Sequence, residues 1–184
     1  MNRPGPLFSV LTPVYNPPLD ALASAIESVR GQTLTDWELI LVDDCSPNPA
    51  VRVALAAAAE SDPRIRVITR AGNGGISASS QTALDSARGE FVALLDHDDS
   101  LDVRALAFVA TAIAANPEVD YIYTDEDKLA LDGTAFDTFA KPSWSPERLR
   151  SQMYTAHLSV LRTALVREVG GFRPGYDGSQ DHDL

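Results

Sequence analysis

The sequence of 184 residues contains one cysteine, Cys45. An internal disulfide is therefore excluded, and a single thiol fits a reducing compartment. Basic residues are also scarce: 15 Lys and Arg stand against 26 Asp and Glu, giving a formal net charge of -11. A general nucleic-acid binder needs a basic surface, so we expect no nucleic-acid partner.

Long apolar runs are lacking as well. No stretch approaches the roughly 20 residues of a membrane-spanning helix, and the alanine-rich stretch at 54–59 is too short. The N-terminus, with Pro4 and Pro6, has no apolar core of a secretion signal. We therefore expect a cytoplasmic protein. Whether it associates peripherally with the inner face of the membrane stays open.

The glycine motifs that bind phosphate are missing too. Nothing in the sequence matches GxxxxGK[ST], and the glycines at 72–75 do not match GxGxxG. A P-loop enzyme and a dinucleotide-dependent oxidoreductase are therefore disfavoured. We interpret residues 72–75 as a loop that bends near the ligand-binding edge of the domain.

Strands and helices are predicted to alternate along the chain. Apolar runs without polar alternation predict buried strands, and spacing near 3.6 residues predicts helices. The predicted strands are 7–14, 37–42, 65–69, 91–95 and 119–124, and the predicted helices are 20–30, 51–60, 77–87 and 101–115. This order indicates a single α/β domain, with a mainly parallel central sheet and helices on both faces.

Polar residues follow four of these strands. The clusters are Tyr15-Asn16, Asp43-Asp44, Asp96-His97-Asp98 and Asp125-Glu126-Asp127. The carboxyl ends of parallel strands meet at one edge of a sheet, where ligands bind. Neighbouring carboxylates repel one another, and Mg²⁺ or Mn²⁺ removes that repulsion. We therefore predict a divalent-cation site, with open positions for phosphate oxygens. The alternative is a set of solvated acidic turns and helix caps.

Five segments of the sequence carry a resemblance to a known family. In order they are 9–16 (SVLTPVYN), 25–33 (AIESVRGQT), 38–46 (ELILVDDCS), 73–77 (NGGIS) and 89–99 (GEFVALLDHDD). In this order and spacing they resemble the family 2 glycosyltransferases with the GT-A fold. The resemblance covers nearly the whole chain.

Four later segments resemble a subgroup of bacterial enzymes that assemble O-antigen and other surface polysaccharides. These segments are 123–128 (YTDEDK), 141–146 (KPSWSP), 170–172 (GGF) and 178–184 (GSQDHDL). The resemblance implies an inverting, metal-dependent transfer, with Mn²⁺ or Mg²⁺. The implied donor is a nucleotide-diphosphate sugar, with UDP or dTDP favoured, and the implied acceptor is a glycan or a lipid-linked glycan.

The resemblance also divides the single domain 1–184 in two. Residues 1–127 correspond to the nucleotide-sugar-binding half, and residues 128–184 to the start of the acceptor-binding half. No helix or turn signal ends the chain at Asp183-Leu184. We expect that the protein continues beyond residue 184.

The first two motifs imply a nucleotide pocket. Thr12, Pro13, Tyr15 and Asn16 match the first-strand motif, with Tyr15 packing on the base. Asp44 matches the acid that accepts a hydrogen bond from the pyrimidine ring N–H, which favours uracil or thymine over cytosine. The alternatives are a rim position for Tyr15 and a turn or cap role for Asp43-Asp44.

The third motif implies the metal ligands. Asp96-His97-Asp98 matches the DxD motif, in which Asp98 is the expected direct ligand. Asp96 is expected near the ribose or the metal, and His97 in a structural or ribose-side contact. His157 lies between apolar residues, so we expect a buried structural histidine in preference to a further ligand.

Asp181 matches the acid of the ED motif and is the predicted general base, with a helix N-cap as the alternative. The usual Glu before it is Gln180 here, which removes one repulsive charge beside the base. A second departure lies after Ser77, itself a predicted nucleotide-sugar contact. There Ser79-Ser80-Gln81 replaces Ala-Arg-Asn, and phosphate contact from that helix is put in doubt.

Four further residues are predicted to contact the donor sugar or the acceptor. They are Asp125, Glu126, Asp127 and Trp144. A salt-bridge network at the strand end is the equal alternative for the acids, and a core or lid position is the alternative for Trp144.

Two other functions compete with glycosyl transfer. A nucleotidyl or phosphoryl transferase also uses acids at strand ends, but it should show a basic clamp in its first loop. Residues 13–20 contain no Lys or Arg. The other competitor is a donor-binding fragment without turnover, because much of the acceptor side would lie beyond residue 184.

Overall fold

The computed structural model describes residues 4–130 and 132–184, so the first three residues of the expected non-secretory N-terminus lie outside it. A six-stranded sheet runs through the domain in the order β3-β2-β1-β4-β8-β5. Its strands are β1 Phe8–Val14, β2 Trp37–Asp43, β3 Ile65–Thr69, β4 Phe91–Leu94, β5 Tyr121–Tyr123 and β8 Ser159–Arg162. The first four strands in this order pair in parallel, whereas β8 is antiparallel to both β4 and β5. The predicted mainly parallel sheet is confirmed.

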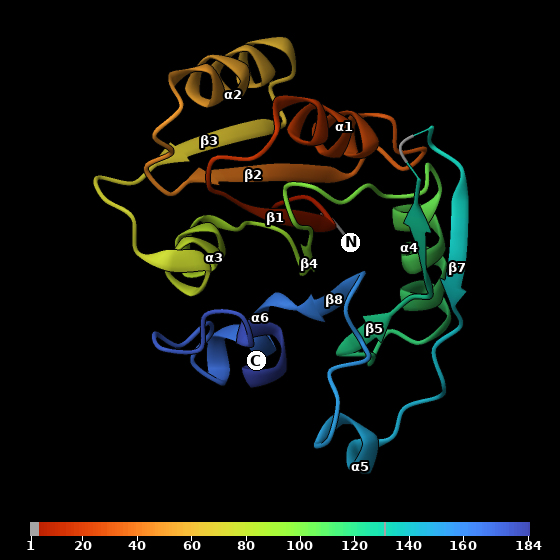
Figure 1. The fold of residues 1–184 in the computed structure, drawn as a ribbon. Coiled ribbons are helices and arrows are strands. Elements are labelled where there is room, and N and C mark those ends of the chain that lie inside the picture. Colours follow the sequence, from red (N-terminus) through yellow and green to blue (C-terminus); the bar gives the residue numbers. More distant parts are fainter. Residues whose placement is uncertain (1–3, 131) are drawn as a thin grey trace.

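Helices cover both faces of the sheet, as predicted (Figure 1). One face carries α1 Leu19–Arg30, α2 Pro49–Ser61 and α4 Ala105–Ala115, and the other carries α3 Gly75–Ser86 and α6 Thr163–Glu168. Alternate strand residues serve the two sides, so Val10 packs in the first core cluster and Leu11 in the second. Burial on both faces is why the strands read as unbroken apolar runs.

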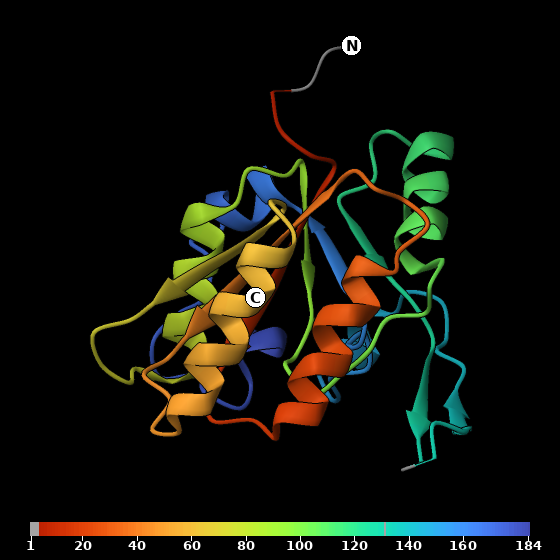
Figure 2. The same ribbon diagram turned by 90° about the horizontal axis from the view of Figure 1, so that it is seen from above.

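The smaller elements are additions to the central sheet and its covering helices. They are the two-stranded hairpin of β6 Glu126–Leu129 and β7 Ala135–Phe139, and the short helices α5 Pro146–Leu149 and α7 Gln180–Asp183. Figure 2 shows α1 and α2 side by side over the sheet, with the hairpin beyond its edge. Within the described ranges, no helix combines the length and the apolar character that crossing a membrane requires.

Some predicted boundaries were wrong. The helix expected at 101–115 begins only at Ala105, because the Asp102 carboxylate accepts the Arg104 backbone N–H at 2.9 Å and holds the preceding residues in a turn. The helix expected at 77–87 begins two residues earlier, at Gly75, whose φ of 85° favours glycine. Strand β8 and the hairpin were not predicted.

A buried carboxylate joins the strands near their amino ends. Both Glu38 oxygens are engaged, by the Ser9 hydroxyl at 2.8 Å, by Arg66 at 3.1 Å and by the backbone and guanidinium of Arg88 at 2.6–2.9 Å. Burial raises the pKa of Glu38, but these donors outweigh it and bring the pKa below its usual value. Glu38 therefore links β1, β2, β3 and the turn into β4 through its charge.

We expect Glu38→Ala to lower the free energy of unfolding by about 3 kcal/mol or more, because two arginines and a hydroxyl lose their buried partner. Urea denaturation measures the loss. Glu27→Ala is the matched control: Glu27 also pairs with an arginine, Arg30, but its side chain is 63% exposed. That change should cost less than about 1 kcal/mol. Equal losses in the two variants would contradict the structural importance of the Glu38 network.

Candidate active site

The register of β8 explains how distant residues meet at one edge of the sheet. Ser159, the first residue of β8, pairs with Leu94 at the end of β4 and with Tyr123 at the end of β5. Because β8 is antiparallel to both, the residues that follow Leu94 and Tyr123 lie beside those that precede Ser159. The acidic run at 96–99, the run at 125–127 and His157 are thereby brought together.

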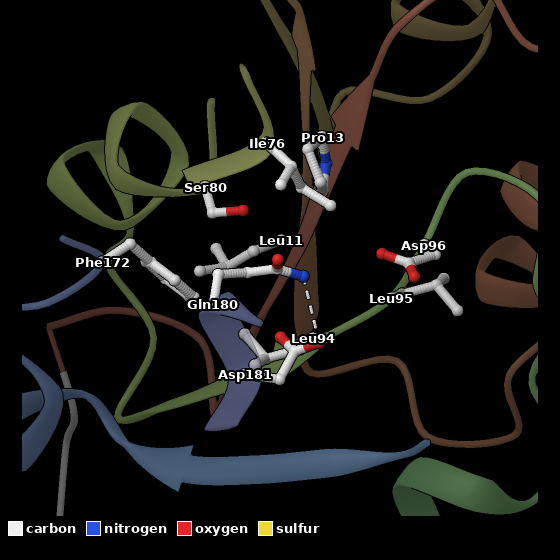
Figure 3. Close-up of a pocket in the computed structure, with 10 residues that line it drawn as sticks. All are labelled: Leu11, Pro13, Ile76, Ser80, Leu94, Leu95, Asp96, Phe172, Gln180 and Asp181. Atoms are coloured by element: carbon white, nitrogen blue, oxygen red, sulfur yellow. Dashed lines mark hydrogen bonds between the residues drawn. The ribbon is translucent and has the colours of Figure 1, made fainter. Parts of the chain in front are cut away.

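Two adjoining pockets open at this edge. Both are lined by Leu94, Asp96 and Asp181. The first adds Leu11 and Pro13 of β1, Ile76 and Ser80 of α3, Leu95, Phe172 and Gln180; the second adds Ala156, His157 and Ser159. Figure 3 shows the first pocket, with Asp96 on the β4 side and Gln180 and Asp181 on α7. The predicted base and the DxD motif therefore share one site.

Asp96, Asp99 and His157 form a compact group. One ligand atom from each lies within 4.8 Å of the other two, and His157 Nδ1 is 3.5 Å from Asp99 Oδ2. Burial raises the pKa of both carboxyl groups; His157 opposes the shift, and neighbouring acids add to it. Two carboxylates and an imidazole are ligands that Mn²⁺ accepts. These residues therefore fit a divalent cation.

The composition of this group differs from the sequence expectation at two positions. Asp98, the expected direct ligand, is exposed and lies outside the group of three, so its role stays a prediction. The expectation of a buried structural His157 was wrong, because its side chain is 43% exposed and faces Asp99. The register of β8 brings it to the site, and no local sequence pattern signals that register.

Asp181 lies in the first turn of α7, whose N-cap is Ser179, so the N-cap alternative was wrong. Gln180 donates from Nε2 to Asp181 Oδ2 at 3.1 Å, and its Oε1 accepts the Gly178 N–H at 2.9 Å. Burial raises the pKa of Asp181, whereas the charge of His157 and the Gln180 hydrogen bond oppose the shift. Gln180 thus supports the ionised carboxylate, as its neutrality suggested.

Asp44 is buried, and its carboxylate is already engaged. It pairs with Arg70 and accepts the backbone N–H groups of Gly74 at 3.1 Å and Gly75 at 2.8 Å. The glycine loop therefore folds onto Asp44 at the pocket edge. These contacts favour the turn role that was weighed for Asp44, and a contact with the base stays a prediction.

The end of β1 contributes several predicted contacts. Tyr15 is 50% exposed, and the Thr12 hydroxyl is buried with no hydrogen-bond partner among the described residues. The Asn16 N–H donates to Ser46 Oγ at 2.9 Å. His97 Nδ1 donates to the Pro13 carbonyl at 3.0 Å, which is the structural contact expected for this histidine.

Ser77 is held from the far end of the chain. Its backbone N–H donates to Asp177 Oδ1 at 2.9 Å, and this bond contributes to the lowered pKa of Asp177. Asp177, which the sequence did not single out, therefore connects the loop before Asp181 to the start of α3. The Ser77 side chain is buried, and its predicted contact with the nucleotide sugar stays a prediction.

The four remaining predicted residues lie beyond β5. Asp125 accepts the Lys141 N–H at 2.7 Å, Glu126 pairs with the Lys141 ammonium at 3.0 Å, and Asp127 accepts from the Thr138 hydroxyl in the hairpin. The ion pair favours the salt-bridge alternative for Glu126, whereas Asp125 and Asp127 accept from neutral donors and their roles stay predictions. Trp144 is half-exposed and meets Tyr121 edge-on, with ring centroids 6.1 Å apart.

The sequence pattern described as Glycosyl transferase family 2 matches residues 9–168. The chain belongs to this family. This glycosyltransferase domain is 50% identical to the uncharacterized protein y4gI of Sinorhizobium fredii over 180 residues, 98% of the chain and 20% of that protein. It is 42% identical to the O-antigen biosynthesis protein RfbC of Myxococcus xanthus over 179 residues, 97% of the chain and 14% of that protein. The chain thus spans a fifth or less of either relative.

Solved structures show the same fold. TarS 1-349 of S. aureus superposes with a TM-score of 0.71 at 21% identity, over 95% of this chain and 52% of that one. The mannosyltransferase PcManGT of Pyrobaculum calidifontis, solved with GDP-Man and Mn²⁺, gives 0.72 at 20% identity, over 97% and 50%. The expected GT-A fold of this glycosyltransferase domain is confirmed.

The pKa of Asp99, which burial raises and neighbouring acids raise further, predicts a pH-dependent change in stability. A carboxyl group whose pKa is raised in the folded state binds more protons there, so it lowers stability as pH rises through the interval above the ordinary aspartate pKa. We expect Asp99→Asn to raise the melting temperature of the metal-free domain at pH 7.5, with the gain vanishing below about pH 4.

Asp98→Asn is the matched control for this experiment, because the exposed neighbour should change the melting temperature less. Differential scanning calorimetry with EDTA, from pH 4 to 8, provides the measurement. A melting temperature that falls at pH 7.5 in Asp99→Asn would contradict the repulsion between the buried acids.

Proposed function

We propose that this domain transfers a sugar from a nucleotide-diphosphate donor to a glycan or lipid-linked acceptor in surface-polysaccharide assembly. The observation that carries the proposal is that Asp96 and Asp181, from segments far apart in the chain, line the same two pockets at the carboxyl edge of the sheet. The names of relatives support it: they include the O-antigen biosynthesis protein RfbC and a chondroitin synthase of Escherichia coli. We place this activity in the cytoplasm, at the inner face of the membrane.

Asp181 is the general base of the proposed reaction. Its carboxylate accepts the proton of the acceptor hydroxyl while that oxygen attacks the anomeric carbon. The bond from the anomeric carbon to the diphosphate breaks on the opposite face of the sugar, so the configuration inverts. Gln180 orients the carboxylate through its hydrogen bond to Oδ2.

Asp96, Asp99 and His157 hold the proposed divalent cation, Mn²⁺ or Mg²⁺. When bound, the cation neutralises the negative charge of the departing diphosphate. Partial burial and nearby acids raise the pKa of Asp96 and Asp99, and a bound cation would offset that cost of ionisation.

The donor base binds beside the end of β1 and the glycine loop, with Tyr15 available to stack. UDP and UDP-GlcNAc are the ligands named with TarS, and GDP-Man is the ligand named with PcManGT. We favour UDP or dTDP because Asp44 matches the acid that, in the family, accepts a hydrogen bond from the pyrimidine ring N–H. A nucleotidyl transferase is disfavoured, since the first loop lacks Lys and Arg.

Calorimetric titration of UDP, dTDP, GDP and CDP, with Mn²⁺ or with EDTA, tests the donor site. We expect Mn²⁺-dependent binding of UDP or dTDP, weakened at least tenfold in Asp96→Asn because the carboxylate that holds the cation is lost. Asp137→Asn, in the hairpin, is the control and should bind like the wild type. Binding of GDP alone would overturn the pyrimidine preference, and binding of no nucleotide would contradict the transferase proposal.

Asp181→Asn separates turnover from donor binding. Loss of the base should reduce nucleotide release from the selected donor by about 10²-fold or more, because an amide cannot accept the acceptor proton. Nucleotide affinity should stay within about twofold of the wild type. Unchanged turnover would remove Asp181 from the reaction, whereas wild-type protein that binds donor without releasing product would favour the binding-fragment alternative.

A further inference from the structure

The backbone of His157 is held by two side chains from distant segments. Lys141 Nζ donates to the His157 carbonyl at 2.9 Å, and Glu126 Oε2 accepts the His157 N–H at 2.7 Å. The two side chains also pair with each other at 3.0 Å. Both polar groups of the His157 backbone are therefore bound by one ion pair.

Burial makes the charged form of Lys141 in this ion pair unfavourable. The Lys141 side chain is 0% exposed, and burial lowers the pKa of its ammonium although Glu126 opposes the shift. The Glu126 side chain is 35% exposed, so the desolvation cost falls mainly on Lys141, and such a pair is weak evidence for a gain in stability. The contacts that Lys141 and Glu126 make with the His157 backbone explain a lysine at position 141 more directly than a gain in stability does.

The surrounding bonds fix the same segment. Thr124 donates its N–H to the Leu158 carbonyl, and its hydroxyl accepts the Leu158 N–H, both at 3.2 Å. Asp125 accepts the Lys141 N–H at 2.7 Å. Residues 124–126 and Lys141 thus form one clamp around residues 157–158. The two sequence segments that contain them, 123–128 and 141–146, both hold the backbone at this point.

The next residues of the first motif behave differently. Asp127 contacts Thr138 and Lys128 pairs with Asp137, both across the exposed hairpin of β6 and β7. Within the segment 123–128, only residues 124–126 therefore belong to the clamp around residues 157–158. The hairpin pair supplies a natural control, with the same charges in a solvent-exposed setting.

We propose that Glu126 and Lys141 are positioning residues that fix the His157 backbone, so that its imidazole lies with Asp96 and Asp99 as the third ligand of the cation. This inference rests on the proposed function. It predicts that the ion pair acts on metal affinity through His157, because a ligand that is free to turn loses the geometry the cation needs. Neither residue needs to touch the donor or the acceptor.

Mn²⁺ binding without nucleotide tests the proposal. We expect Glu126→Gln and Lys141→Met to weaken Mn²⁺ about tenfold, as loss of the groups that orient a metal ligand does. The electron paramagnetic resonance signal of free Mn²⁺ measures the affinity, and circular dichroism verifies folding. Asp137→Asn and Lys128→Met make the same chemical changes in the hairpin and should leave Mn²⁺ affinity unchanged.

A double-mutant cycle with His157→Ala separates positioning from general destabilisation. If Glu126 acts through His157, Glu126→Gln has no further effect once the imidazole is gone. An equal tenfold loss in both backgrounds would overturn the proposal, and so would wild-type affinity in Glu126→Gln. Glu126→Gln is isosteric, so it carries the test if Lys141→Met does not fold.

Failure of this inference is distinct from failure of the proposed function. If Asp96→Asn and His157→Ala weaken Mn²⁺ binding while Glu126→Gln does not, the clamp is overturned and the cation site stands. If the wild-type domain binds no Mn²⁺, both the clamp and the metal-dependent reaction are overturned.

Discussion

The partial burial of three carboxyl groups at one edge of the sheet is the constraint on which the site depends. Asp96, Asp99 and Asp181 reach one edge of the sheet, and burial raises the pKa of each. The His157 imidazole opposes the rise in pKa in all three cases. An arrangement of this kind is unfavourable alone, and the proposed cation would remove part of that cost.

The antiparallel insertion of β8 makes this arrangement possible. In an all-parallel sheet, the residues before β8 would lie at the opposite edge from the residues after β4. Reversing one strand brings both to the same edge, with Ser159 opposite Leu94 and Tyr123. The acids of two other strands then meet His157 without a long loop, and the rigid core of β1, β2 and β4 supports them.

The sequence predicted those parts whose signal is local. Residues 37–42 read as a buried strand because both faces are covered, and β2 is found at Trp37–Asp43. Polar Ser159 and Arg162 flank only two apolar residues in β8, and the hairpin strands are mostly exposed, so neither was predicted. The DxD spacing located the acidic loop, but the choice between Asp98 and Asp99 depends on how that loop turns. His157 depends on strand register, which a single sequence does not encode locally.

Glu38 and Asp96 show that the two edges of the sheet surround a carboxyl group differently. Glu38 and Asp96 both lose water on folding, and burial is the largest influence on each pKa. At the amino ends of the strands, Arg66, Arg88 and Ser9 donate to Glu38 and bring its pKa below the usual value. At the carboxyl ends, Asp96 faces other acids instead, and its pKa is raised. The donors around Glu38 therefore outweigh the effect of burial, whereas at Asp96 His157 opposes the rise in pKa without outweighing burial and the neighbouring acids.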